Sequence, residues 1–269
     1  MIHLIRNMAF GDVLWLEPVV RYLTERDHRV NVVTYFPTIF DGFPSPLLSV
    51  NHLHPLPEEH LLIHMNYEET PSRHILESYR ANANAPDMEL TYPRLYLSEA
   101  EKQPPVSGKY VVLHLEKNPY VNHRNVYGVQ WEKVVDAIEQ LGMRTIQISK
   151  SRTAIYGQWE PLSDWREMMS LIYHAKYFIG IDSGPSHIAT AFGIPSLLFF
   201  GSVNPAYRHL PTFRGIFLQG FCEYPQCYHK VISPRGQPCR FVGDTGIPPC
   251  CVHTTDKVIE TFLQLQSMF

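Results

Sequence analysis

Six consecutive residues in the C-terminal half of the chain have the side chains and spacing of an anion-binding loop. They are Asp182, Ser183, Gly184, Pro185, Ser186 and His187. The apolar run 177–181 predicts a buried strand before them, and 186–192 predicts a short helix that begins where the strand stops. Because the amide groups at a helix N-terminus lack partners and attract negative charge, this segment predicts a site for a phosphate-bearing ligand.

A second loop of small residues, Gly201 to Pro205, follows another predicted strand at 196–200. Open parallel sheets bind ligands beyond the carboxyl ends of their strands, so we expect both loops at one edge of the same sheet. Such a sheet requires strands and helices to alternate along the surrounding chain.

Alternation of this kind is predicted on both sides of a linker at 91–107. Residues 1–90 contain predicted strands at 2–6, 28–34 and 61–65, and predicted helices at 11–26 and 72–84. Residues 108–269 contain further predicted strands at 109–115 and 144–149, and helices at 130–141 and 255–266. The rhythm predicts an α/β fold with parallel sheets in two domains, 1–90 and 108–269.

The composition limits the classes of partner. A chain of 269 residues with 45% hydrophobic content can bury a sizeable core, and its net charge of -3 argues against nucleic acid as a partner. No apolar run is long enough to span a bilayer, and residues 1–6 predict a strand rather than a signal peptide. We therefore expect a cytoplasmic protein without a transmembrane segment; peripheral contact with a membrane is left open.

Three motifs occur in an order that resembles a known family. The first is Phe-Gly-Asp-Val-Leu at 10–14, with a proline soon after it in the predicted helix. The second is the loop at 182–187, followed by Ala189, Ala191, Gly193 and Pro195. The third is Phe-Gly-Ser-Val-Asn-Pro at 200–205. Together they resemble glycosyltransferase family 9, the bacterial heptosyltransferases.

This resemblance implies a GT-B-type α/β fold, with two Rossmann-like βα domains that face each other across a cleft. It implies that the C-terminal domain binds a nucleoside-diphosphate sugar, with ADP-heptose a candidate, and that the N-terminal domain binds the acceptor. The sugar would move to an acceptor hydroxyl by inverting displacement without a catalytic metal or other cofactor.

The resemblance also implies roles for single residues. Asp12 matches the position of the family's general base, whereas Asp182 would position hydroxyl groups of the donor sugar or ribose. Gly184, Ser186 and His187 would hold the diphosphate. Each assignment has a structural alternative: either aspartate could cap the helix that follows it, and the histidine could bond a buried carbonyl.

Three further charged residues are weaker candidates for donor binding. Lys117 and Arg124 lie in the loop after the predicted strand 109–115, where a cation could neutralise a departing phosphate. Glu160, in the next predicted loop, is a candidate for contacting the nucleoside. The alternative for all three is a solvated surface charge.

All the cysteines lie in one proline-punctuated stretch that has little core of its own. They are Cys222, Cys227, Cys239, Cys250 and Cys251. Adjacent cysteines do not suit a disulfide framework, so the cluster predicts either a structural zinc or iron site or reduced thiols.

The acceptor is the least determined part of the prediction, because the N-terminal domain is shorter than is usual in the family. A glycan, a lipid-linked acceptor and a protein side chain all remain open, within lipopolysaccharide or glycan biosynthesis. Two other functions fit the same architecture: a nucleotide-sugar epimerase or hydrolase, and a non-catalytic subunit that binds a sugar nucleotide.

Overall fold

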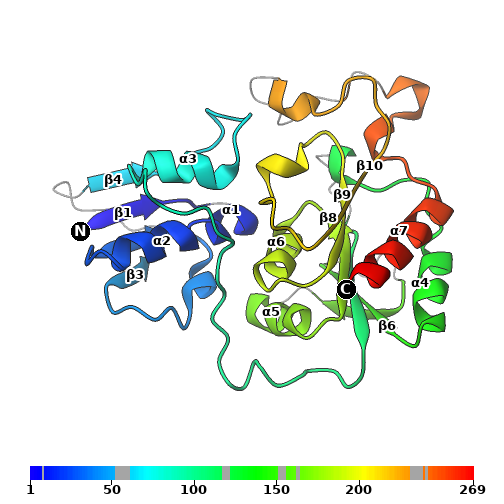
Figure 1. Ribbon diagram of the computed structural model, residues 1–269, viewed down its shortest axis with the longest axis horizontal. Coiled ribbons are helices and arrows are strands. Elements are labelled where there is room, and N and C mark those ends of the chain that lie inside the picture. Colours follow the sequence, from blue (N-terminus) through cyan, green and yellow to red (C-terminus); the bar gives the residue numbers. More distant parts are fainter. Residues whose placement is uncertain are drawn as a thin grey trace. The chain divides into compact units, whose positions relative to one another are not determined.

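The computed structural model describes residues 1–7, 9–51, 61–116, 122–150, 156–161, 164–230, 239 and 242–269. It divides into two compact units (Figure 1). Unit 1 consists of Met1–Ala100 and Ala206–Pro211, and unit 2 consists of Glu101–Pro205 and Thr212–Phe269. The first division falls inside the predicted linker at 91–107, but nothing in the sequence predicts the short segment that returns to unit 1.

Unit 1 contains a four-stranded parallel sheet. Its strands are β1 (Ile2–Ile5), β2 (Val30–Val33), β3 (Leu48–Asn51) and β4 (Leu61–His64), in the order β3-β2-β1-β4. All four residues of β2 are buried, as expected for a strand of a sheet covered on both faces. The sequence did not predict β3, whose residues are partly or fully exposed in alternation.

Three α-helices accompany this sheet: α1 (Phe10–Leu14), α2 (Glu17–Thr24) and α3 (Ile75–Asn82). The prediction of one helix over 11–26 is wrong, because the chain breaks between α1 and α2. Pro18 lies in the first turn of α2, where its missing N–H costs nothing, whereas it would interrupt a continuous helix. The α3 helix is shorter than its predicted span 72–84 because His74 caps it, with Nδ1 accepting a bond of 3.1 Å from the Leu76 amide.

Unit 2 contains a six-stranded parallel sheet in the order β10-β9-β8-β5-β6-β7. Its strands are β5 (Tyr110–His114), β6 (Arg144–Ser149), β7 (Gln158–Pro161), β8 (Tyr177–Ile181), β9 (Ser196–Phe200) and β10 (Gly215–Gln219). The predicted spans of β6, β8 and β9 match residue for residue. The sequence did not predict β7 and β10, and β7 places Glu160 on a strand, so its assignment to a loop is wrong.

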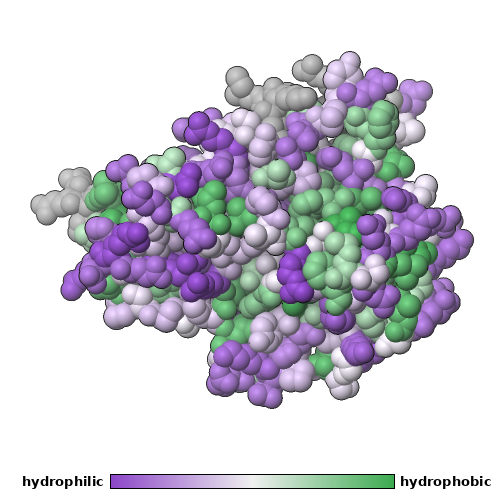
Figure 2. Space-filling model, viewed as in Figure 1, coloured by the Kyte–Doolittle hydropathy of each residue, from purple (hydrophilic) through white to green (hydrophobic). Residues whose placement is uncertain are grey.

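Four α-helices cover the faces of this second sheet: α4 (Trp131–Gln140), α5 (Trp165–Tyr173), α6 (Gly184–Ala191) and α7 (Thr255–Met268). Figure 1 shows α4 and α7 together on one face, and α5 and α6 on the other. The buried side of α4 packs Trp131 and Ile138 into a core that includes Phe262 of α7. Each such buried side chain contributes roughly 1.5–3 kcal/mol. The outer side of α4 is hydrophilic (Figure 2).

The remaining short helices are of the 3-10 type: η1 (Pro37–Phe40), η2 (Asn122–Arg124), η3 (Pro205–Tyr207), η4 (Cys227–Lys230), η5 (Gly243–Thr245) and η6 (Pro249–Cys251). None of the helices in the described residues is both long enough and apolar enough to cross a membrane.

Each sheet has one place where the order of its strands reverses. In unit 1 the chain builds outward from β1 to β2 and β3, and then returns to the other side of β1 with β4. In unit 2 it builds from β5 to β6 and β7, and then returns to the other side of β5 with β8. Loops that follow two such neighbouring strands diverge and leave room for a ligand.

Candidate functional site

Asp12 lies beyond the carboxyl end of β1, at the reversal point of unit 1. It is the third residue of α1, and the residue before that helix is Ala9, which makes no side-chain capping bond. The Asp12 amide donates to the Ala9 carbonyl at 3.0 Å. The alternative in which Asp12 is the N-cap of its helix is therefore wrong.

A buried ion-pair network surrounds the Asp12 carboxylate. Arg6 Nη2 donates to Asp12 Oδ2 and, at 2.8 Å, to Glu68 Oε1. Arg6 Nη1 completes a two-bond contact with Glu68 at 3.1 Å, and the Tyr67 hydroxyl donates to Asp12 Oδ2 at 3.4 Å. The described residues thus direct their hydrogen bonds to Oδ2, which leaves Oδ1 of the same carboxylate for another partner.

Burial and charge act in opposite directions on this carboxylate. Desolvation raises the pKa of Asp12 above its usual value, while the positive charges of Arg6 and Arg208 act to lower it. For Glu68 burial also acts to raise the pKa, but the hydrogen bond and the positive charge of Arg6, together with backbone hydrogen bonds, outweigh it and hold the pKa below the usual value. A carboxylate with a raised pKa is a stronger base, which suits it to accept a proton near neutral pH.

Four members of this network escaped sequence reasoning: Arg6, Tyr67, Glu68 and Arg208. The first three lie within four residues after the ends of β1 and β4, so the rule that ligands bind beyond the ends of parallel strands could have selected them once β4 was known to pair with β1. Arg208 had no such signal, because it lies in the segment that returns to unit 1.

In unit 2 the predicted anion loop lies at the other reversal point. Asp182 directly follows β8, Ser183 is the N-cap of α6, and Gly184 and Pro185 form the first turn. The alternative in which Asp182 caps the helix is therefore wrong. Ser186 Oγ accepts from the Ser183 amide at 3.1 Å and donates to the Ser183 carbonyl at 2.7 Å, which fixes the turn.

Asp182 lies between two basic side chains. Arg124 Nη2 is 3.6 Å from Asp182 Oδ2, and His187 Nε2 is 3.8 Å from Asp182 Oδ1. Asp182 and His187 are buried, whereas the side chain of Arg124 is 31% exposed. The structure therefore brings Arg124 to the predicted anion loop and leaves part of its side chain accessible.

His114, at the end of β5, is a contact of this loop that the sequence did not predict. Its Nδ1 lies 3.1 Å from Ser183 Oγ, and its Nε2 lies 3.9 Å from Glu116 Oε2. The hydrogen bond from His114 holds the pKa of Glu116 below its usual value. The loops after β5 and β8 are thus joined by polar side chains, as expected at a reversal point.

Of the weaker candidates, Glu160 does not join this group. Glu160 lies on the edge strand β7, where Oε1 accepts a bond of 2.8 Å from Gln158 Nε2. Because β5 and β6 separate β7 from β8, Glu160 is about 14 Å from the loop that follows β8. Lys117 lies outside the described residues.

The cysteines cluster without forming a ligand set. Cys250 and Cys251 are buried with their sulfurs 4.0 Å apart, and Cys222, Cys227 and Cys239 are partly buried. Burial raises the pKa of the Cys227 thiol, and the nearby thiols of Cys239, Cys250 and Cys222 raise it further. Within the described ranges, no three His, Cys, Asp or Glu side chains converge on a point that could hold a metal ion. These residues thus show no preformed ligand set, and the metal site predicted at the five cysteines stays a prediction.

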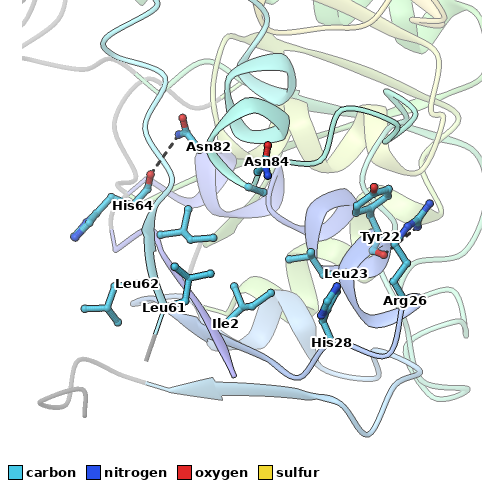
Figure 3. A pocket seen from close by; sticks show the side chains of 12 residues that line it. Ile2, Tyr22, Leu23, Arg26, His28, Leu61, Leu62, His64, Asn82 and Asn84 are labelled. Atoms are coloured by element: carbon cyan, nitrogen blue, oxygen red, sulfur yellow. Dashed lines mark hydrogen bonds between the residues drawn. The ribbon is translucent and has the colours of Figure 1, made fainter. Parts of the chain in front are cut away.

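A groove of about 680 Å³ runs along the edge strand β4 of unit 1 (Figure 3). Its polar wall includes Arg26 and Asn82, and the latter donates to the His64 carbonyl at 3.3 Å. None of the predicted site residues lines it.

Comparison with protein families gives a match at residues 161–212, which fit the model of glycosyltransferase family 9 (heptosyltransferase). The matched segment contains the whole loop from Asp182 to His187. The resemblance to family 9 is confirmed.

Two curated relatives carry related names. The chain is 30% identical over 125 residues to the autotransporter heptosyltransferase Aah of Escherichia coli, a match that covers 42% of this chain and 31% of that protein. It is 36% identical over 92 residues to the autotransporter heptosyltransferase BAHTCr of Citrobacter rodentium, covering 29% of this chain and 22% of the relative. The chain thus aligns with about a third or less of each curated relative's length.

Solved structures share the fold at low sequence identity. The iron-containing dodecameric glycosyltransferase TibC of enterotoxigenic E. coli matches with a TM-score of 0.79 and 18% identity, over 99% of this chain and 76% of TibC. The E. coli ADP-heptose lipopolysaccharide heptosyltransferase II matches with a TM-score of 0.67 and 14% identity, over 99% and 98%. The predicted α/β fold of GT-B type is confirmed.

Proposed function

We propose that this chain is a heptosyltransferase that moves a heptose from ADP-heptose to an acceptor hydroxyl. The match of residues 161–212 to family 9 carries the proposal, because that segment holds the anion loop from Asp182 to His187. A structure of TibC was solved in complex with ADP-D-beta-D-heptose, and this relative shares the fold. Group transfer from a diphosphate needs a base and a site for the leaving group, and the chain offers a buried carboxylate at Asp12 and an anion loop at 182–187 for these two tasks.

In the proposed reaction, Asp12 acts as the general base. Its Oδ1 accepts the proton of the acceptor hydroxyl while the hydroxyl oxygen forms a bond to the anomeric carbon of the heptose. The bond from that carbon to the phosphate oxygen breaks, and its electron pair leaves with ADP. A single displacement of this kind inverts the anomeric configuration.

In the same proposal, the α6 loop binds the donor and stabilises the leaving group. The amides at the start of α6 and the partly exposed side chain of Arg124 supply positive potential for the diphosphate, so no metal is required for this step. Asp182 positions hydroxyl groups of the ribose or heptose, and Ser183, Gly184, Pro185, Ser186 and His187 form the diphosphate cradle. Lys117 remains a candidate for a further phosphate contact, and Glu160 for the nucleoside.

The acceptor that we propose is a protein side chain. The support is that both curated relatives are named autotransporter heptosyltransferases. A glycan or a lipid-linked acceptor remains the alternative within the same reaction.

We also propose a structural iron or zinc at the cysteines. TibC is described as iron-containing, and thiolates are ligands that both metals accept. Burial raises the pKa of Cys227, and three neighbouring thiols raise it further because thiolates repel one another; a bound cation would relieve that repulsion. Against this stands the lack of a converging ligand set among the described residues, so a bound metal would have to draw the thiolates together.

The deciding experiment incubates the protein with ADP-heptose and candidate acceptors, and measures ADP release and acceptor mass. The expected result is an acceptor-dependent gain of one heptose residue per ADP released. ADP release at the same rate without an acceptor would favour a hydrolase, and a change in the heptose without ADP release would favour an epimerase. Binding of ADP-heptose without any turnover would favour the non-catalytic subunit.

A further inference from the structure

The segment Ala206–Pro211 is part of unit 1, although it follows the last motif of unit 2 in sequence. Tyr92 fixes it through two hydrogen bonds to the backbone of Leu210: the hydroxyl donates to the carbonyl at 3.3 Å and accepts from the amide at 3.0 Å. Arg208 and His209 are almost fully buried, at 3% and 2% exposure. A strongly hydrated side chain such as arginine is seldom buried to this extent without a specific role.

Arg208 reaches the Asp12 network through the ring of Tyr67. Its guanidinium carbon lies 4.8 Å from the centre of that ring, and the guanidinium carbon of Arg6 lies 5.1 Å from the same centre. The Tyr67 hydroxyl in turn donates to Asp12 Oδ2. The two guanidinium groups thus hold the Tyr67 ring by cation–π contact, and the hydroxyl of this ring contacts the candidate base Asp12.

The charges of the network balance only when Arg208 is counted. The groups that face Asp12 are Arg6 after β1, Tyr67 and Glu68 after β4, Tyr79 on α3, and Arg208. Burial raises the pKa of Tyr79 well above 10, so this phenol stays neutral and donates to the Asp12 carbonyl at 3.2 Å. Two carboxylates then face two guanidinium groups. Without Arg208 the network, in which Asp12 is buried and Glu68 half-buried, would hold one unbalanced negative charge, which favours protonation of Asp12.

We propose that Arg208 is a positioning residue that keeps Asp12 ionised and holds Tyr67 against Asp12 Oδ2, so that Oδ1 is free to accept the proton of the acceptor. This inference rests on the proposed function of Asp12 as a general base. It adds that the base of unit 1 depends on a residue contributed by the chain about 200 positions later, in the segment next to the Phe-Gly-Ser-Val-Asn-Pro motif.

The direct test is the titration of Asp12 itself. It is monitored by carbon-13 NMR in protein labelled at the aspartate carboxyl carbons. The signal is assigned by its absence in Asp12→Asn. In Arg208→Met, which keeps an unbranched chain and removes the guanidinium and its charge, the titration midpoint of Asp12 is expected to move to higher pH. In Arg208→Lys, which keeps the charge, it is expected to stay close to that of the wild type.

The Tyr67→Phe variant tests the contribution of the hydroxyl apart from that of the ring. It keeps the platform for both guanidinium groups and removes the bond to Oδ2, so the midpoint of Asp12 is expected to move to higher pH here as well. An Asp12 midpoint that is the same in wild type, Arg208→Met and Tyr67→Phe would overturn the inference. If Arg208→Met does not fold, Arg208→Lys and Tyr67→Phe still decide the matter: Tyr67→Phe must move the midpoint and Arg208→Lys must not.

Turnover of ADP-heptose distinguishes this inference from the proposed function. If Asp12→Asn retains the turnover of the wild type, Asp12 is not the base, and the proposed function fails whatever Arg208 does. If Asp12→Asn is inactive but Arg208→Met leaves both the Asp12 midpoint and the acid limb of the kcat profile unchanged, only the role of Arg208 fails. A purely structural role would lower the melting temperature of Arg208→Met and leave that acid limb in place.

Discussion

Asp12 and Asp182 occupy the reversal points of their respective sheets, one beyond the pair β1 and β4 and the other beyond the pair β5 and β8. Their surroundings differ in the way that their proposed tasks require. The Asp12 network holds a carboxylate whose pKa is raised by burial, whereas Asp182 lies between Arg124 and His187 at the start of a helix. One arrangement suits proton transfer, and the other suits the binding of a negatively charged donor.

Replacement of Asp12 by asparagine separates catalysis from binding. We expect turnover of ADP-heptose to fall by about 10²–10⁴-fold, the contribution typical of a general base. The affinity for ADP, measured by calorimetry, should not change, because the proposed donor residues belong to unit 2. The matched control is Asp27→Asn, an exposed position of unit 1 with a left-handed φ of 62°, which asparagine tolerates. It should retain the wild-type rate.

The pH dependence follows from the direction of the Asp12 pKa. Since burial raises that pKa above the usual 3.8, the rate should fall on acidification at a pH above the ordinary carboxyl range. The pH dependence of the stability has the opposite sign to that expected for a paired surface carboxylate. A raised folded-state pKa contributes stability below the unfolded-state pKa, and this contribution is lost as the pH rises through the folded-state pKa.

Melting temperatures of the wild type and Asp12→Asn across pH measure this loss directly. The wild type should become less stable relative to the variant as the pH increases through the Asp12 titration. A difference that is constant with pH would contradict the raised pKa.

The sequence predicts the parts of this site that depend on neighbouring residues, but not those that depend on contacts between residues far apart in the chain. The run from Tyr177 to Ile181 is uniformly apolar and so predicts β8, and the loop after it follows by adjacency. The edge strand β7 escaped prediction because its Trp159, Glu160 and Pro161 show neither an apolar run nor a regular alternation. β7 forms a strand because it pairs with β6, and no local sequence pattern encodes that pairing.

The same limit applies to the Asp12 network. Arg6 lies six positions before Asp12, but Glu68 lies 62 positions after Arg6. Their contact depends on the pairing of β1 with β4. Arg208 is more distant still, and only the return of residues 206–211 to unit 1 brings it to Tyr67.

Gly201 of the third motif offers a test of close packing near the donor loop. A Cβ at this position would meet the carbonyl oxygen of His123, and would lie 2.7 Å from Cys251 Sγ. Gly201→Ala should therefore displace His123 and its neighbour Arg124, weaken ADP binding, and cost about 1–3 kcal/mol of stability. The control is Gly142→Ala, where φ is 75° but no heavy atom lies within 4 Å. It should cost stability and leave ADP affinity unchanged.

Metal analysis tests the cysteine cluster. Protein purified without added metal should contain stoichiometric iron or zinc, and Cys227→Ser should lose it, because the neighbours of Cys227 include three other thiols. The measurement is elemental analysis by mass spectrometry, together with the melting temperature before and after chelation. Wild-type protein that contains no metal and melts at the same temperature with a chelator would leave the cysteines as reduced thiols.

Tyr92 tests whether the segment 206–211 is held in place. Tyr92→Phe removes both hydrogen bonds to the Leu210 backbone, and should cost about 1–3 kcal/mol because two buried backbone groups lose their partner. Amide hydrogen exchange at residues 206–211 should become faster, and the Asp12 midpoint should move toward that of Arg208→Met. The control is Tyr110→Phe, which removes a buried bond of 2.7 Å to the Leu171 carbonyl within unit 2. It should lower stability to a similar degree without changing exchange at 206–211. Equal exchange in both variants would mean that Arg208 is held by its own contacts with Tyr67 rather than by the anchor at Tyr92.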